Sequence, residues 1–210
     1  MPDTLENLLK NPYIWQGQSH IRYADLECLP SGYSKLDQHL PGGGWPQNSL
    51  TEILLDNYGI GELRLLMPAL THLSFPTDDS GSGWIAWIAP PFEPFPPALK
   101  EWGINLSRIL IIWPNRFKDI LWAVEQALSS GTCAAVLLWP NMLDDVTSRR
   151  LQLAAKKGQS WAIAFRPFNA QSQISAAKLR IRIDASAEGT HLNIFKVCGG
   201  RPVIVRDYAG

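Results

Sequence analysis

The sequence predicts an α/β fold, in which helices cover a mostly parallel central sheet as a three-layer sandwich and antiparallel strands follow at the C-terminal end. Two observations support this prediction. Short, continuous apolar runs, typical of strands covered on both faces, alternate with helical segments along the chain. From residue 178 to residue 183, apolar residues instead alternate with basic ones, as in a strand with one face in water.

Length and composition indicate a globular protein. The 210 residues are 46% hydrophobic and 18% charged, which favours a large interior and argues against disorder. Lys and Arg together number 19, as do Asp and Glu, so the net charge is zero and gives no reason to expect autonomous nucleic-acid binding. The N-terminal residues lack a secretory pattern, and no apolar run approaches the length that spans a bilayer. We expect a cytoplasmic protein.

The chain is expected to have three parts. Residues 1–30 form an N-terminal arm, residues 31–183 a core domain, and residues 184–210 the C-terminal strands and a tail. The core begins with a short helix, which a Gly/Pro-rich turn ends before the first buried strand, at residues 49–55. An apolar stripe at helical spacing predicts a helix from about residue 59 to residue 73.

The remaining elements follow in alternation. A helix over residues 116–129 has an apolar stripe and ends near Gly131, and another is capped by Asp144 and ends before Gly158. A short helical segment lies near residues 99–102. The further parallel strands are expected at residues 84–89, 109–113, 133–139 and 161–165, and the C-terminal strands at residues 178–183, 192–197 and 203–205.

The connection after the first strand occupies the position of a phosphate loop but lacks its chemistry. The pattern G-x-x-x-x-G-K-[ST] needs a Lys for the terminal phosphates and a hydroxyl for magnesium. Here the Lys position holds Ile60 or Glu62, and the hydroxyl position holds Gly61 or Leu63. We therefore interpret this segment as a degenerate phosphate loop, made of Asp56, Asn57, Tyr58, Gly59, Ile60, Gly61 and Glu62.

Catalytic groups are missing elsewhere too. An ATPase of this layout needs carboxylates at the ends of neighbouring strands, but these strands end in Trp139-Pro140 and Pro90-Pro91. The four His and three Cys residues form no metal-binding or nucleophile pattern. The sequence therefore predicts no catalytic residues, no bound metal and no cofactor.

Two basic groups and one Trp are candidates for an interaction surface. The first group lies on one helix, the second on one strand face, and the Trp lies in the turn before the first strand. These groups are either ordinary solvated surface or a docking patch for an acidic protein or for DNA phosphates. The candidates are Trp45, Arg149, Arg150, Lys156, Lys157, Lys178, Arg180 and Arg182.

Several blocks of sequence resemble the ImuA family, the RecA-like accessory proteins of bacterial translesion synthesis. The blocks include GYSKLD, GGGWP, SLTEIL, GIGELRLLMPAL and DDVTSRRLQLAAKKGQ, and they lie within residues 31–183. The central region, from ILWAVEQALSSGTCAAVLLWP to AFRP, is also similar to SulA, an SOS inhibitor of cell division with a related fold. Both resemblances imply a RecA-like fold in which the ATPase residues are lost.

The two resemblances imply different partners. An ImuA-type protein would be a non-catalytic SOS scaffold that works with ImuB, a Y-family polymerase homologue, with an error-prone C-family polymerase and with RecA. A SulA-type protein would bind the tubulin-like FtsZ and block its assembly. A nucleotide-dependent ATPase is a third and weaker reading. The ImuA resemblance extends further along the chain, so the sequence favours the scaffold and keeps the division inhibitor as the alternative.

Overall fold

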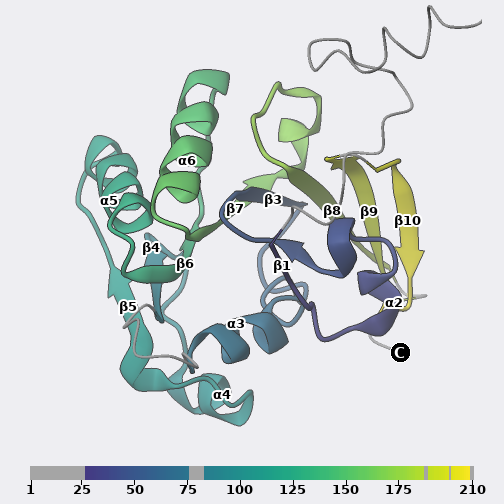
Figure 1. The fold of residues 1–210 in the computed structure, drawn as a ribbon, viewed down its shortest axis with the longest axis horizontal. Helices are drawn as coiled ribbons and strands as arrows, with labels where there is room; N and C mark the ends of the chain where they lie inside the picture. The colour runs from purple at the N-terminus through teal and green to yellow at the C-terminus, as the bar shows by residue number, and fades with distance from the viewer. Residues whose placement is uncertain (1–26, 76–82, 187–188, 199, 209–210) are drawn as a thin grey trace, which may run out of the picture.

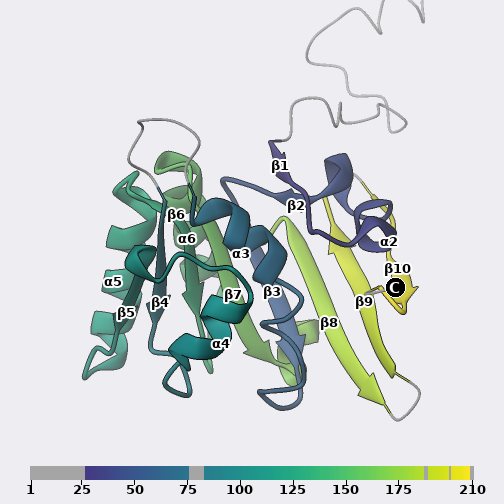
Figure 2. The ribbon, with the colours of Figure 1, turned by 90° about the horizontal axis from the view of Figure 1, so that it is seen from below.

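Eight strands form one mixed sheet in the order β10-β9-β8-β3-β7-β6-β4-β5, and Figure 2 shows them side by side. The computed structural model describes residues 27–75, 83–186, 189–198 and 200–208. The strands are β3 (Leu50–Leu55), β4 (Trp84–Ile88), β5 (Ile109–Ile112), β6 (Cys133–Leu138), β7 (Trp161–Pro167), β8 (Leu179–Ser186), β9 (Gly189–Val197) and β10 (Val203–Arg206). Strands β8 to β5 in this order pair in parallel, whereas β9 and β10 are antiparallel additions.

Two long helices lie together on one face of the sheet. These are α5 (Phe117–Ser129) and α6 (Asp145–Lys157), which contact each other and the central strands (Figure 1). Their buried residues, among them Val124, Leu128 and Leu151, pack on β6, β4 and β7. Gly158 ends α6 so close to α5 that an added Cβ would lie 1.9 Å from the Leu128 carbonyl oxygen, so only glycine fits there.

Short elements cover the opposite face. They are the helices α2 (Ser34–Asp37), α3 (Met67–Leu73) and α4 (Pro96–Glu101), the 3-10 turns η2 (Pro41–Gly43) and η3 (Leu106–Arg108), and a two-stranded sheet of β1 (Cys28–Leu29) and β2 (Trp45–Pro46). The larger core cluster lies on this side and includes Trp45, Leu66, Phe165 and Ile181. Strand β3, buried along its whole length, lies between the two cores.

The prediction of a RecA-like three-layer sandwich is wrong. Only α5 and α6 are long helices among the described residues, and the connection from β7 to β8 holds the 3-10 turn η4 (Phe168–Ser172) in place of a helix. The helix expected over residues 59–73 begins at Met67, because Pro68 has no amide hydrogen to donate to Arg64. The Tyr33 hydroxyl donates to that Arg64 carbonyl instead, at 2.9 Å.

The structure can be compared with the expected division of the chain at two boundaries, near residue 30 and after residue 183. Residues 1–26 of the N-terminal arm lie outside the described residues, and residues 28–29 form β1. The expected boundary after residue 183 falls inside β8, which continues to Ser186 and joins β9 and β10 to the main sheet. No helix in the described part of the chain has both the length and the apolar character needed to cross a membrane.

Candidate interaction surface

The segment that the sequence analysis interprets as a degenerate phosphate loop, residues 56–62, is held by one of its own side chains. Glu62 is 5% exposed, and both of its carboxylate oxygens accept hydrogen bonds from the Gly59 amide, at 2.9 and 3.0 Å. Gly59 and Gly61 have φ angles of +86° and +104°, in the left-handed region that favours glycine. The backbone amide that could have faced a phosphate therefore already binds a carboxylate.

The surroundings of this loop also lack features of a nucleotide site. The helix after the loop, α3, has seven residues and begins five residues beyond Glu62. The amides of its N-terminus therefore do not belong to the loop and do not form an anion-binding site together with the Gly59 amide. At the end of β6, Trp139 stacks on Phe165 with ring centroids 5.0 Å apart and lies 5.7 Å from Trp87. Aromatic side chains thus pack together at the end of β6.

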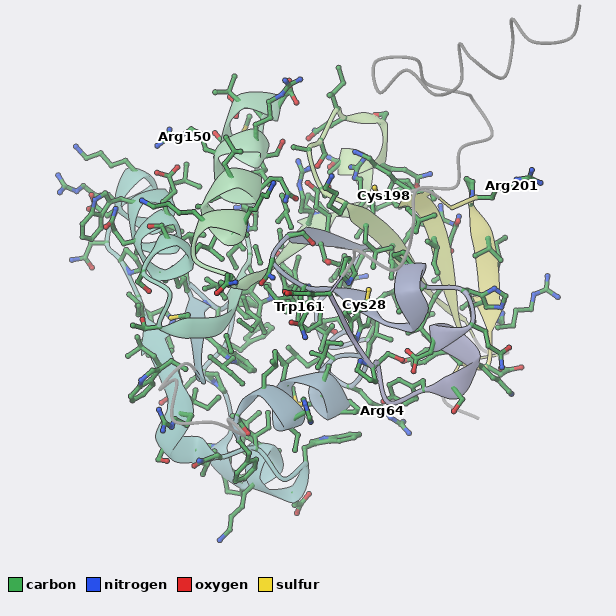
Figure 3. All side chains as sticks on the ribbon, viewed as in Figure 1. Cys28, Arg64, Arg150, Trp161, Cys198 and Arg201 are labelled. Atoms are coloured by element: carbon green, nitrogen blue, oxygen red, sulfur yellow. The ribbon has the colours of Figure 1, made fainter. Side chains whose placement is uncertain are left out.

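The candidate arginines of α6 are exposed but already paired. Asp144 caps the helix by accepting a hydrogen bond from the Thr147 amide at 2.8 Å. Arg149 pairs with Asp145 at 3.0 Å, and Arg150 reaches across to Glu125 of α5 at 2.8 Å. Figure 3 shows Arg150 at the periphery of the molecule. These pairs neutralise much of the positive charge on the first turns of α6.

Three other candidates are less accessible than expected. Trp45 is fully buried and packs on Trp161 with ring centroids 5.4 Å apart, so the expectation that it is exposed is wrong. Trp161 lies in the interior in Figure 3. Arg180 is 4% exposed and pairs with a buried carboxylate, so it cannot be a docking residue in this conformation. Arg182 is partly buried between Asp184 and the ring of Phe168.

A buried cluster of charges, which the sequence analysis missed, explains the position of Arg180. Glu52 of β3 is fully buried, and its Oε1 accepts hydrogen bonds from Arg166 Nη1 at 3.0 Å and from the Ser175 hydroxyl at 2.6 Å. Its Oε2 accepts one from Arg180 Nε at 2.7 Å. The sequence does contain a sign of this cluster, a single Glu inside the apolar run SLTEIL. If this run is a buried strand, the Glu must have a charged or hydrogen-bonding partner.

The same arginines hold the connection between β7 and β8 against the sheet. Arg180 donates to the backbone carbonyls of Ala170, Gln171 and Gln173, at 2.7 to 3.2 Å. Arg166 donates to the Leu143 carbonyl at 2.9 Å and to the Gln173 side chain at 2.6 Å. Because these groups are buried and bonded to one another, we assign the cluster a structural role.

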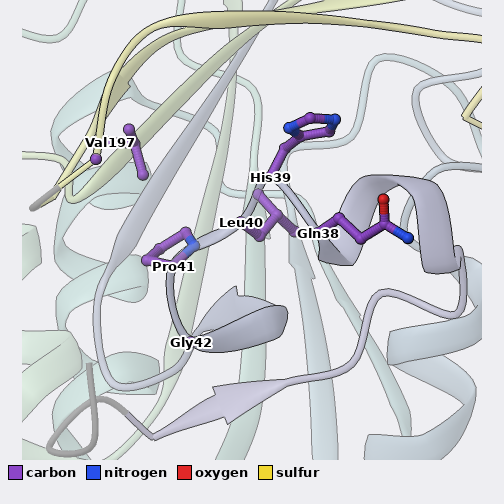
Figure 4. Close-up of a pocket in the computed structure, with 7 residues that line it drawn as sticks. Gln38, His39, Leu40, Pro41, Gly42 and Val197 are labelled. Carbon is purple, nitrogen blue, oxygen red and sulfur yellow. The ribbon is translucent and has the colours of Figure 1, made fainter.

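Two depressions on the described surface offer further candidate sites. One has a volume of about 430 Å³ and lies between the end of α2, η2 and the end of β9; Figure 4 shows His39, Leu40, Pro41 and Val197 around it. Its lining holds one titratable side chain, His39, and offers little chemistry. The other, about 620 Å³, lies between α6 and the residues that precede β3 and β8, and its lining includes Lys156 and Lys178. No group of three or more His, Cys, Asp or Glu residues among those described could hold a metal ion.

Another surface feature is a run of exposed apolar side chains. Large hydrophobic side chains are exposed along the segment that runs from β4 through α4 and β5 into α5, and β5 is the edge strand of the sheet. Exposed aromatic and aliphatic side chains are common at protein-binding sites when they lie close together. Its residues are Trp84, Phe92, Phe95, Trp102, Leu106, Leu110, Trp113 and Trp122, which we call the apolar segment.

The described residues thus form an α/β protein in which Glu62 holds the loop after β3 and large hydrophobic side chains are exposed between β4 and α5. The family model for the cell division inhibitor SulA matches residues 50–162, just over half of the chain, and the protein belongs to this family. The match includes β3 to β6, both long helices and the whole apolar segment. The SulA part of the resemblance in sequence is therefore confirmed, whereas the ImuA part stays a prediction.

Known SulA proteins cover part of the chain. The cell division inhibitors SulA of Yersinia pestis (strain Pestoides F) and Yersinia pseudotuberculosis serotype O:1b (strain IP 31758) are each 30% identical over 106 residues, 50% of this chain and 60% of theirs. The crystal structure of SulA from Pseudomonas aeruginosa is 28% identical, with a TM-score of 0.45, and the match covers 56% of this chain and 97% of that one.

Proposed function

We propose that the protein is a non-catalytic inhibitor of cell division of the SulA type, which acts in the SOS response by binding FtsZ and blocking its assembly. The observation that carries this proposal is the SulA family match over residues 50–162. The closed loop at Glu62 fits a protein that works by binding alone. FtsZ forms filaments in the cytoplasm, so we also propose a cytoplasmic location.

The apolar segment is our candidate for the FtsZ-binding surface. It lies within the matched residues, and Leu110 and Trp113 at the edge of the sheet are 42% and 53% exposed. Aromatic side chains in such positions bury a large area on binding and often carry much of the affinity. A protein that covers one end of an FtsZ subunit in this way would prevent the next subunit from adding.

The test is an FtsZ assembly assay. With GTP and an equimolar amount of the protein, we expect the sedimented fraction of FtsZ to fall by about half or more, if the concentrations exceed the Kd. The double variant Leu110→Ala, Trp113→Ala should lose this effect while its circular dichroism spectrum stays unchanged. Ile204→Ala is the matched control, since Ile204 is 58% exposed on β10 at the opposite edge of the same sheet.

Two results would contradict the proposal. If a large excess of the folded protein leaves FtsZ assembly unchanged, the division-inhibitor function is excluded. If assembly is blocked equally by the double variant, FtsZ is the partner but the apolar segment is not the binding surface. ATP turnover by the purified protein, abolished by a change in the loop, would contradict the non-catalytic role.

A specific observation keeps a second candidate. The family match ends at residue 162, so most of β7 and all of β8, β9 and β10 lie outside it, as do residues 1–49 with the blocks GYSKLD and GGGWP. These extra parts support an ImuA-type accessory role in translesion synthesis, with an ImuB-type polymerase homologue, RecA and an error-prone C-family polymerase as partners. Specific capture of purified ImuB, without any effect on FtsZ, would favour this candidate.

A further inference from the structure

The cleft at the end of α6 gathers positive charge that the fold does not use. Its lining comes from α6, from the segment before β3 and from Lys178, which precedes β8. Glu27, the first residue that the structure describes, also lines it. Lys156 and Lys178 are both exposed, and neither forms an ion pair with any described residue. Two exposed ammonium groups in one cleft therefore remain available to a ligand.

Neighbouring charges strengthen the positive potential of this region. Lys196 donates to the Ser175 carbonyl at 2.6 Å, and its pKa is lowered by burial and also by the nearby positive charges of Arg180 and Lys178. The buried cluster adds to this, since Arg166 and Arg180 share the single carboxylate of Glu52. The carboxylate that lines the cleft, Glu27, already accepts a hydrogen bond from Asn48.

Amide side chains line the cleft, and hydrogen bonds hold one of them, Gln152, and the backbone of Lys178 in place. Four amide side chains line it: Gln47, Asn48, Gln152 and Gln159. The Gln152 Oε1 accepts a hydrogen bond from the Leu50 amide at 3.0 Å, which fixes this side chain and leaves its Nε2 group as a donor. The Lys178 amide donates to the Leu50 carbonyl at 2.9 Å, so the backbone that carries this lysine is anchored as well.

From these features we propose that the cleft binds an acidic, extended peptide segment of a partner protein. The ammonium groups of Lys156 and Lys178 pair with its carboxylates, and the amide side chains bind its backbone. Leu153, 67% exposed and part of the lining, offers contact to one apolar side chain of the peptide. A volume of about 620 Å³ is within the range of sites that hold ligands of a few residues.

The lining favours a peptide over a nucleic acid. Single-stranded nucleic acids are bound by basic grooves in which aromatic side chains stack on the bases. Among the described residues that line this cleft, none is aromatic. Amide groups, in contrast, pair well with the alternating donors and acceptors of a peptide backbone. An oligonucleotide is therefore an alternative that the experiment must exclude.

The experiment measures binding of short fluorescein-labelled probes to the full chain by fluorescence anisotropy. The probes are a peptide of alternating Asp and Leu, the same peptide with Asn in place of Asp, and an oligodeoxythymidylate. We expect the acidic peptide to bind about tenfold more tightly than its amide counterpart, and its affinity to fall as salt is raised. Glu27→Gln should raise the affinity about two- to threefold, because it removes a like charge from the cleft.

Charge reversal provides the matched control. The double variant Lys156→Glu, Lys178→Glu should weaken binding of the acidic peptide about tenfold or more. Lys100→Glu, Lys118→Glu changes the net charge equally at exposed lysines of α4 and α5 and should leave binding unchanged. Equal affinity for the two peptides, equal effects of the two double variants, or tighter binding of the oligonucleotide would each overturn the proposal. No FtsZ is present, so failure here leaves the assembly assay unaffected.

Discussion

Glu52 is the residue on which the centre of the sheet most depends. It lies on β3, and its two oxygens bind arginines from the neighbouring strands β7 and β8. Removing one member of a buried ionic cluster leaves the other charges without compensation, which is much more costly than losing an exposed pair. The pairing thus ties three adjacent strands and the connection above them into one unit.

We expect Glu52→Ala to lower the free energy of unfolding by about 3–5 kcal/mol, because two buried guanidinium groups lose their counter-charge. Glu52→Gln, which keeps a hydrogen-bond acceptor but not the charge, should lose less. Urea unfolding followed by circular dichroism measures both. Arg182→Ala breaks a partly exposed pair with Asp184 and should change stability by about 1 kcal/mol or less; a loss as large as that of Glu52→Ala would contradict this account.

At single residues, sequence reasoning succeeded where the local pattern decides and failed where distant contacts do. Asp144 was recognised as a helix cap because its hydrogen bond spans three residues. Trp45 was placed on the surface because it lies in a Gly/Pro turn, whereas its burial depends on Trp161, more than a hundred residues away. Likewise, nothing local to Arg180 distinguishes it from Lys178, although one is buried against Glu52 and the other is exposed.

Among the elements, α6 has the clearest set of terminal signals. Asp144 caps its first turn, Lys156 and Lys157 lie in its last turn, and Gly158 follows. These charges complement the helix dipole at both ends. The limits of α6 could therefore be predicted from the sequence almost to the residue, as could those of α5.

The contribution of the Asp144 cap to the stability of α6 should depend on pH. The hydrogen bonds from Thr147 hold the pKa of Asp144 below its usual range. Because the folded-state pKa is the lower one, the stabilisation is present above about pH 4 and is lost as the pH falls through the folded-state value.

Asp144→Ala should therefore lower the urea midpoint at neutral pH, and the difference from the natural protein should shrink as the pH falls through the lowered pKa of Asp144. Asp56→Ala, at an exposed loop position without a capping bond, is the control and should leave the midpoint unchanged. A difference that is independent of pH would contradict the assigned role of the carboxylate.

In α3 the same kind of reasoning failed. Ile60, Leu63 and Met67 follow helical spacing, but the segment before Met67 forms turns. The two glycines with positive φ and the missing amide of Pro68 prevent a regular helix there. A periodic stripe predicts which residues are buried more reliably than it predicts where a helix begins.

For the whole molecule, the strands and their approximate limits could be predicted, but the architecture could not. Apolar runs identify strands, yet their order in the sheet is set by contacts between distant segments. The described residues have two long helices and a β7–β8 connection without an α-helix, and this differs from the RecA-like arrangement that the family resemblances implied. The family match corrects this prediction for residues 50–162.

The strands beyond the family match should be essential for folding. Leu192, Ile194, Val205 and Tyr208 are all buried in the larger core cluster. Each contributes about 1.5–3 kcal/mol on burial, and their sum is comparable with the total stability of a typical domain, about 5–15 kcal/mol. A chain that ends at Ser186 should therefore lose cooperative thermal unfolding, measured by circular dichroism.

Ile204→Asp, at an exposed position of β10, is the control for this truncation and should keep the transition. A truncated chain that still unfolds cooperatively near the temperature of the full protein would show that β9 and β10 are accessories to an independent core. That result would also support a separate role for these strands.

The carboxylate of Glu62 on the Gly59 amide has a consequence for regulation. Nucleotide-dependent switch proteins change shape because a terminal phosphate holds a loop that is released on hydrolysis. In this chain the loop after β3 is instead held by hydrogen bonds to Glu62, a side chain of the loop itself. If the protein binds a partner as proposed, no nucleotide is needed to hold this loop, and the bound fraction of the partner is set by the protein's concentration and the Kd.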